Sequence, residues 1–181
     1  GLYFLTRLAK ACGVYNYLEP VLSFPLGTSS VSAAEVAKIY QTFISGKTYK
    51  FFEEGPENQI TFIRRIEDRN GKVLYQSNPI IHQLVDEKIS LQMNEILNKV
   101  VTHGTGRRAR GELYIRFGKK ELPGFSSHQD IRIPAFGKTG TTNDYTSSYF
   151  AGYLPRPTKI GEPLDTEDSY TISAYVGYDM N

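Results

Sequence analysis

The sequence contains one cysteine, Cys12, among 181 residues, which excludes an internal disulfide and a cysteine-built metal site. Cys12 lies in an apolar helical pattern, so we expect it to be an ordinary buried core residue. The three histidines, His82, His103 and His128, lack the spacing of zinc ligands. No pair of carboxylates stands out as an acid–base pair. We therefore expect neither a metal ion nor a cofactor.

An excess of charge of one sign is also missing. The 21 Lys and Arg residues nearly balance the 19 Asp and Glu residues, and the net charge of +2 does not indicate nucleic acid as a partner. No apolar run approaches the roughly 18 residues that span a bilayer. The chain opens at Leu2 in a helical pattern, without a signal peptide or an N-cap residue. This abrupt opening predicts a fragment of a longer protein.

Three segments carry helical signals. The first starts at Leu2 and ends near Gly13. The second has Ser32 as its N-cap with Glu35 three residues later, a capping box, and Gly46 closes it. The third lies between residues 86 and 104. The residues of this third helix expected to face the core are Ile89, Met93, Ile96 or Leu97, and Val100.

Strand signals fill much of the remaining chain. Asn70-Gly71 between two strand-like runs predicts a hairpin, and "ELYIRF" predicts a short strand. Three further strands are predicted at "IRIPAFGKTG", "SSYFAGYL" and "YTISAYVGY", with a charged Pro- and Gly-rich loop, "PRPTKIGEPLDTED", before the last. Helices followed by neighbouring strands favour an α+β fold in which helices pack on an antiparallel sheet.

The stretch "GTGRRA" at 104–109 fits the loose pattern of a dinucleotide-binding loop. That motif must follow a strand and open a helix, whereas this stretch follows a predicted helix and leads into a loop. We interpret it as a helix-ending turn with a solvated basic cluster made by Arg107, Arg108 and Arg110. An anionic partner for these arginines is the alternative interpretation. The basic stretch continues to Lys120, and we assign it no function.

The stretch "FGKTGTT" places a cation, hydroxyl groups and glycines within a predicted strand. Glycine inside a strand often marks the close approach of a ligand or of another backbone, here at Gly140. Lys138 offers a fixed positive charge, and Thr139 and Thr141 offer hydroxyl donors. A backbone N–H just after Gly140 is placed to meet a carbonyl oxygen. Together these groups suit a substrate with a carboxylate and a polarised carbonyl that lies along the strand edge.

These residues resemble a known family. "GKTGTTNDY…YFAGYLP" followed by "SAYVGYD" is similar to the C-terminal part of the transpeptidase domain of penicillin-binding proteins. Lys-Thr-Gly is one of three motifs of the serine penicillin-recognising enzymes. Three upstream segments resemble the bifunctional, class A members in the same order: "PLGTSSVSAAEVAKIYQTFISG", "RIEDRNGKVLYQ" and "VVTHGTGRRA". The resemblance covers nearly the whole chain, 1–181, and implies a partial domain of β-lactamase/transpeptidase-like fold.

The resemblance also implies an activity. In this family a serine of an S-x-x-K motif attacks a peptide that ends in D-Ala-D-Ala, and an amine of a neighbouring peptide then takes the acyl group, which cross-links peptidoglycan. β-Lactams acylate the same serine. Such covalent catalysis needs an activated nucleophile, a base and an oxyanion hole. The expected partners are therefore the peptidoglycan stem peptide and β-lactams.

The sequence departs from the family at two of the three motifs. The S-x-x-K motif is missing, because no lysine has a serine three positions before it. The second motif, S-x-N, is also missing, because no asparagine has a serine two positions before it. In the family both motifs lie upstream of the segment that matches residue 1. We therefore expect the chain by itself to be inactive, and its nucleophile and base to lie in an upstream part of the same protein. The parent is expected outside the cytoplasm, anchored in the bacterial cytoplasmic membrane.

The resemblance assigns roles to four residues. Lys138 provides positive charge to the cleft and to the substrate carboxylate, and Thr139 and Thr141 bind that carboxylate through their hydroxyls. Gly140 lets the substrate come close to the strand. The backbone N–H of Thr141 is one of two oxyanion-hole donors. Thr142 and Asn143 match an extension of the motif without an assigned role, and no role is carried onto Ser148-Tyr149, where the family often has an acidic-aromatic pair.

Two alternatives stay open. The first is a non-catalytic module that uses the Lys-Thr-Gly strand to hold a peptide carboxylate without acylation. The second is a fragment of a stand-alone β-lactamase or D,D-carboxypeptidase relative, against which the class A-like segments upstream of Lys138 argue.

Overall fold

The computed structural model describes residues 1–51, 63–110, 114–115, 131–142, 146–156 and 165–178. Its longer helices are α1 (Leu2–Ala11), α2 (Ala33–Ser45) and α3 (Glu87–Thr102), and two short 3₁₀ helices are η1 (Phe24–Leu26) and η2 (Arg107–Arg110). The strands are β1 (Lys47–Lys50), β2 (Arg65–Glu67), β3 (Val73–Gln76), β4 (Ile80–Gln83), β5 (Tyr114–Ile115), β6 (Ile131–Arg132), β7 (Phe136–Thr141), β8 (Ser147–Arg156) and β9 (Asp165–Gly177).

Cap residues mark both ends of α2, the start of α3 and the end of α1. α2 starts with the predicted capping box: the Glu35 N–H donates to the Ser32 hydroxyl, and the Ser32 N–H donates to the Glu35 carboxylate. Gly46 ends α2 in the left-handed region, at φ +76°. Asp86 caps α3 by accepting from the Lys88 N–H. Gly13, at φ +104°, follows the last turn of α1, as expected.

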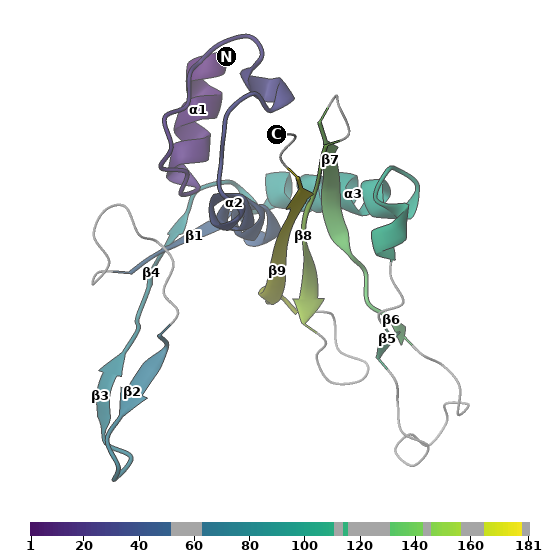
Figure 1. Cartoon of the computed structure of the whole chain (residues 1–181). Coiled ribbons are helices and arrows are strands. Elements are labelled where there is room, and N and C mark those ends of the chain that lie inside the picture. Colours follow the sequence, from purple (N-terminus) through teal and green to yellow (C-terminus); the bar gives the residue numbers. More distant parts are fainter. Residues whose placement is uncertain (52–62, 111–113, 116–130, 143–145, 157–164, 179–181) are drawn as a thin grey trace.

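The main sheet has the order β7-β8-β9, and both pairs are antiparallel. α2 packs against β8 and β9, and α3 packs against β7. Figure 1 shows these two helices beside the sheet and the β2–β3 hairpin extending away from both. The predicted α+β fold, with helices on an antiparallel sheet, is confirmed.

Between the helices and the sheet lies a core built from both. The buried members Ile44, Leu97 and Tyr153 come from α2, α3 and β8 in turn, and the Phe136 ring stacks on the Tyr153 ring with centroids 5.0 Å apart. Asn94 joins these elements, because its amide donates to the Ile44 carbonyl at 3.2 Å and its oxygen accepts from the Tyr153 hydroxyl. Burial raises the pKa of Tyr153, with a smaller contribution from the neighbouring Tyr40.

The face of α3 that meets the core agrees in part with the predicted one. Leu97 is buried and Met93 packs against the core, as predicted. Ile89 and Ile96 are more than half exposed, so the prediction for Ile89 was wrong, and of the alternatives Ile96 and Leu97 only Leu97 faces the core. The buried residues of the helix are Ser90, Asn94, Leu97 and Val101. Two of these four are polar, and a search for apolar periodicity therefore could not find them.

The strand predicted over "IRIPAFGKTG" is two strands. β6 ends at Arg132 and pairs with β5, whereas β7 begins at Phe136 and pairs with β8. Pro134 lies between them and has no N–H to give to a ladder, which explains the break. The hairpin at Asn70-Gly71 is confirmed, with Gly71 at φ +79° and the Asp68 carboxylate accepting from the N–H groups of Asn70 and Lys72.

Several expectations fall outside the described residues. They concern His128, Asn143, the loop at 157–164 and most of the basic stretch after Arg110. Cys12 is buried as predicted, at 4% exposure, and burial raises the pKa of its thiol, which a hydrogen bond with Thr42 partly offsets. Within the described residues, no helix combines the length and the apolar character needed to cross a bilayer.

Candidate functional site: the free edge of strand β7

All four residues assigned from the sequence lie on β7. Among the described strands, β8 flanks β7 on one side and nothing pairs with its other side, so β7 has a free edge. Successive side chains of a strand leave opposite faces, so Lys138 and Gly140 share one face while Thr139 and Thr141 share the other. What all four residues share is their place along the free backbone edge of β7.

The hydrogen-bond pattern of the ladder tells which backbone groups point to that edge. The Thr142 N–H donates to the Ser147 carbonyl at 3.2 Å, so these two residues form a bonded pair. Directly opposite residues of an antiparallel pair alternate between bonded and non-bonded. Thr141 lies opposite Ser148, one step along the same register, and its N–H and carbonyl therefore point away from β8. The same alternation turns the backbone groups of Thr139 outward.

The Lys138 ammonium group lies at the same free edge of β7. The Lys138 side chain is exposed, and its ammonium group donates to the Thr139 carbonyl oxygen at 2.6 Å. That carbonyl is one of the outward-pointing groups, so the positive charge lies at the free edge of β7. A carboxylate that approaches the edge would find both the ammonium group and the outward N–H of Thr141.

The two glycines of β7 have different surroundings. A Cβ at Gly137 would lie 2.6 Å from the Phe150 ring and 2.7 Å from the Ala151 carbonyl oxygen, so the fold itself requires glycine there. A Cβ at Gly140 would meet Tyr149 Cβ at 3.4 Å, an ordinary contact. Nothing in the described chain therefore requires glycine at position 140. Because Gly140 has no side chain, it leaves open space beside the strand.

Sequence reasoning missed Thr105. Thr105 lies in the turn after α3, and its hydroxyl lies 2.6 Å from the Thr139 hydroxyl, so it holds a candidate binding group. Gly104 and Gly106 flank it, and a Cβ at Gly104 would lie 2.9 Å from the Val100 carbonyl oxygen. The signal was the Gly-Thr-Gly stretch itself, which was interpreted as a simple helix-ending turn.

Comparisons with known proteins agree with the resemblance found in the sequence. The chain is 31% identical over 155 residues to penicillin-binding protein 1A of Aquifex aeolicus, covering 86% of this chain and 18% of that protein. It is 31% identical over 135 residues to penicillin-binding protein 1B of Vibrio cholerae, covering 75% and 14%. Penicillin-binding protein 4 of Bacillus subtilis is 27% identical over 179 residues, covering 91% and 22%. No protein-family model matches the chain.

An α+β unit with Lys-Thr-Gly on an edge strand is consistent with part of a β-lactamase/transpeptidase-like domain. The chain is a relative of the penicillin-binding proteins, and most of those it matches are of the class A kind, 1A or 1B. It spans less than a quarter of the length of each of the three relatives described above.

Proposed function

We propose that the chain is the C-terminal portion of one penicillin-binding transpeptidase domain and supplies the Lys-Thr-Gly wall of its active site. The observation that carries this proposal is the free edge of β7, where the Lys138 ammonium and the outward N–H of Thr141 lie on a strand with open space at Gly140. The similarity to penicillin-binding proteins over most of the chain supports it.

In the proposed reaction the substrate is a stem peptide that ends in D-Ala-D-Ala. A serine outside this chain bonds to the carbonyl carbon of the penultimate residue, and the bond to the terminal D-Ala breaks as that residue leaves with a proton on its amine. An amine of a second peptide then attacks the acyl-serine, and the serine recovers its proton. Each attack places negative charge on the carbonyl oxygen, which needs donors in fixed positions.

The residues of this chain have positioning and electrostatic roles in that scheme. Lys138 and the hydroxyls of Thr139 and Thr141 bind the terminal carboxylate. The Thr141 N–H donates to the developing oxyanion, together with a second N–H from the upstream part. Gly140 admits the substrate to the strand edge. Thr105 holds the Thr139 hydroxyl through the 2.6 Å contact.

The nucleophile and its base are proposed to come from upstream sequence with S-x-x-K and S-x-N motifs, neither of which occurs in this chain. The intact protein would act outside the cytoplasm, anchored in the cytoplasmic membrane, on peptidoglycan and β-lactams.

Labelling with a fluorescent penicillin tests this division of the site. This 181-residue chain should form no covalent adduct, whereas the longer protein read upstream of Gly1 should label at a serine. An adduct on the chain by itself would show that the nucleophile is present in it. If the upstream sequence lacks both motifs and the longer protein binds the peptide without labelling, the chain is a binding module.

A further inference from the structure

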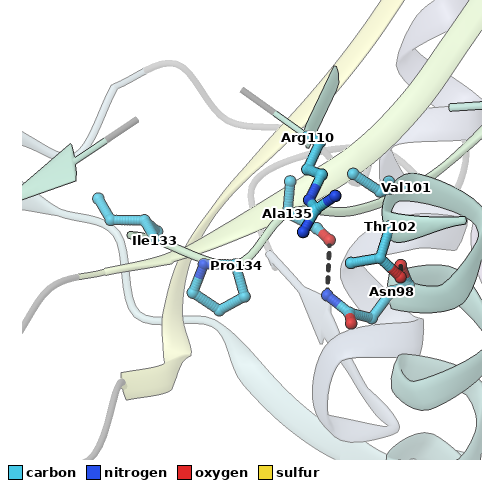
Figure 2. Close-up of a pocket in the computed structure, with 7 residues that line it drawn as sticks. All are labelled: Asn98, Val101, Thr102, Arg110, Ile133, Pro134 and Ala135. Carbon is cyan, nitrogen blue, oxygen red and sulfur yellow. Dashed lines mark hydrogen bonds between the residues drawn. The ribbon is translucent and has the colours of Figure 1, made fainter. Parts of the chain in front are cut away.

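A pocket of about 220 Å³ lies beside the start of β7, and none of its lining residues belongs to that strand. Figure 2 shows its walls, and the residues that line it are Asn98, Val101, Thr102, Arg110, Ile133, Pro134 and Ala135. The last turns of α3 form one wall, the connection between β6 and β7 forms another, and Arg110 of η2 reaches across them.

The walls divide into an apolar part and a polar part. Val101, Ile133, Pro134 and Ala135 offer carbon surface, whereas Arg110 brings a guanidinium group. In Figure 2 the Arg110 side chain points toward the carbonyl group of Ala135. Arg110 is exposed and makes no ion pair with any carboxylate in the part of the chain that the structure describes.

The carboxyl end of a helix carries partial negative charge, which would oppose an anion in this pocket. At the end of α3 much of this charge is already satisfied. The Val100 carbonyl accepts from the N–H groups of Gly104 and Gly106, and the Lys99 carbonyl accepts from the His103 N–H. The tight Gly104–Gly106 turn that makes these bonds also brings η2, and with it Arg110, over the pocket.

We propose that this pocket is a second binding site, which takes a small carboxylate with a short branched apolar body. The guanidinium of Arg110 would hold the carboxylate through two parallel hydrogen bonds, and the apolar walls would cover the carbon atoms. The volume lies below the roughly 300–1,000 Å³ typical of drug-sized ligands, so it selects a small molecule. Neither the Lys-Thr-Gly strand edge nor the proposed acylation uses this pocket.

The position of the pocket connects it to β7. The Asn98 amide donates to the Ala135 carbonyl at 3.1 Å, and Phe136, the next residue, is the first of β7. A ligand against Asn98 and Ala135 would therefore contact the segment that anchors the strand. Binding is expected to change the amide environment of Ala135 and Phe136 as well as that of the α3 wall.

The test is a titration of this chain with 3-methylbutanoate, followed by the amide chemical shifts of Val101, Thr102 and Ala135 in ¹H–¹⁵N spectra. We expect saturable shifts with a Kd on the order of 1 mM, as for small ligands of few atoms. The neutral analogue 3-methylbutanamide, titrated in the same way, should bind at least about tenfold more weakly because the charge-assisted bonds are lost.

Two matched variants test whether the Arg110 guanidinium is the group that binds the carboxylate. Arg110→Gln should weaken 3-methylbutanoate binding about tenfold or more, whereas Arg107→Gln, a change in the same short helix but outside the pocket, should leave it unchanged. The proposal is overturned by equal binding of acid and amide, by equal weakening in both variants, or by no shift at these amides. The amide comparison needs no substitution, so a failure of one variant to fold does not remove the test.

Discussion

The Glu35 carboxylate connects two parts of the chain through five hydrogen bonds. It accepts from the N–H groups of Tyr15, Asn16 and Ser32 at 2.7–3.1 Å, and from the Asn16 amide and the Ser32 hydroxyl. Desolvation by burial raises its pKa, but these donors outweigh that effect and hold the pKa below its ordinary value. The residue thus joins the segment after α1 to the start of α2.

The first prediction concerns Glu35→Gln at neutral pH. The change removes the negative charge that these donors share, so we expect a loss of about 1–3 kcal/mol in the free energy of unfolding. Urea unfolding at pH 7 measures it. The control is Glu95→Gln on the exposed side of α3, whose ion pair with Lys99 is in water and should not contribute measurably.

The pH dependence of the same pair is a second prediction. Because the folded pKa of Glu35 is depressed, its contribution is fully present above its unfolded value of about 4.3 and is lost as the pH falls through the folded value. The difference in stability between the native chain and Glu35→Gln should therefore shrink below about pH 4. A difference that stays constant from pH 7 to pH 3 would mean that another interaction causes the loss.

Glu35 also shows what a sequence can predict about one residue. The capping box follows from a local spacing of three residues and was predicted correctly. The contacts with Tyr15 and Asn16 join positions 19 or 20 residues apart, and only the folded chain brings them together. The Gly-Thr-Gly stretch marked Thr105, but its partner Thr139 is 34 residues away, and only the folded chain shows their contact.

At the scale of elements, α3 shows that a helix can be located correctly while its buried face is predicted only in part. The core-facing side of α3 includes Asn94, whose two hydrogen bonds tie α2 and β8 to the helix. A buried polar group is tolerated when it is fully bonded, and periodicity of apolar residues does not reveal it. Ile89, which the pattern selected, is exposed, and of the alternatives Ile96 and Leu97 only Leu97 is buried.

A matched pair of substitutions tests the corrected face of α3. Leu97→Ala should lower the free energy of unfolding by about 2–5 kcal/mol, because it opens a cavity next to Ile44 and Tyr153. Ile96→Ala, at the adjacent and 57% exposed position, should change it by less than about 0.5 kcal/mol. Chemical denaturation of both variants measures the free energy of unfolding. Equal losses in the two variants would contradict the assignment of Leu97 to the buried face of α3.

Substitutions at the two glycines of β7 distinguish a role in folding, expected for Gly137, from the proposed role in binding, expected for Gly140. Gly137→Ala should destabilise the chain by about 1–3 kcal/mol, since its Cβ would press on the Phe150 ring and on the Ala151 carbonyl. Gly140→Ala should leave stability within about 0.5 kcal/mol of the native value. In the longer protein it should nevertheless slow acylation by penicillin.

Thermal or urea unfolding measures the first part of this glycine prediction, and the rate of penicillin labelling measures the second. Normal labelling by a stable Gly140→Ala variant would show that ligands do not approach the strand at this position. A large loss of stability at Gly140 would instead mean that its role lies in the fold.

At the scale of the whole molecule, the sequence predicted the α+β layout and the strand that carries the candidate site. It did not show that β7 is the edge of its sheet, because strand order depends on contacts between distant segments. It led us to expect that the Thr141 N–H meets a ligand, but the outward direction of the Thr139 and Thr141 backbone groups follows from the register with β8, which the sequence does not give. The roles of these residues in binding and catalysis remain proposals that follow from the resemblance.

The most direct measurement is the rate at which a penicillin acylates the longer protein with and without Lys138. If Lys138 provides the charge of the site, Lys138→Ala should slow acylation by on the order of 10²–10³, the usual cost of removing one preorganised electrostatic donor. Lys99→Ala, which removes an exposed lysine from α3, should react at the native rate. Near-normal acylation of Lys138→Ala would contradict the account and make Lys138 a structural residue of the strand.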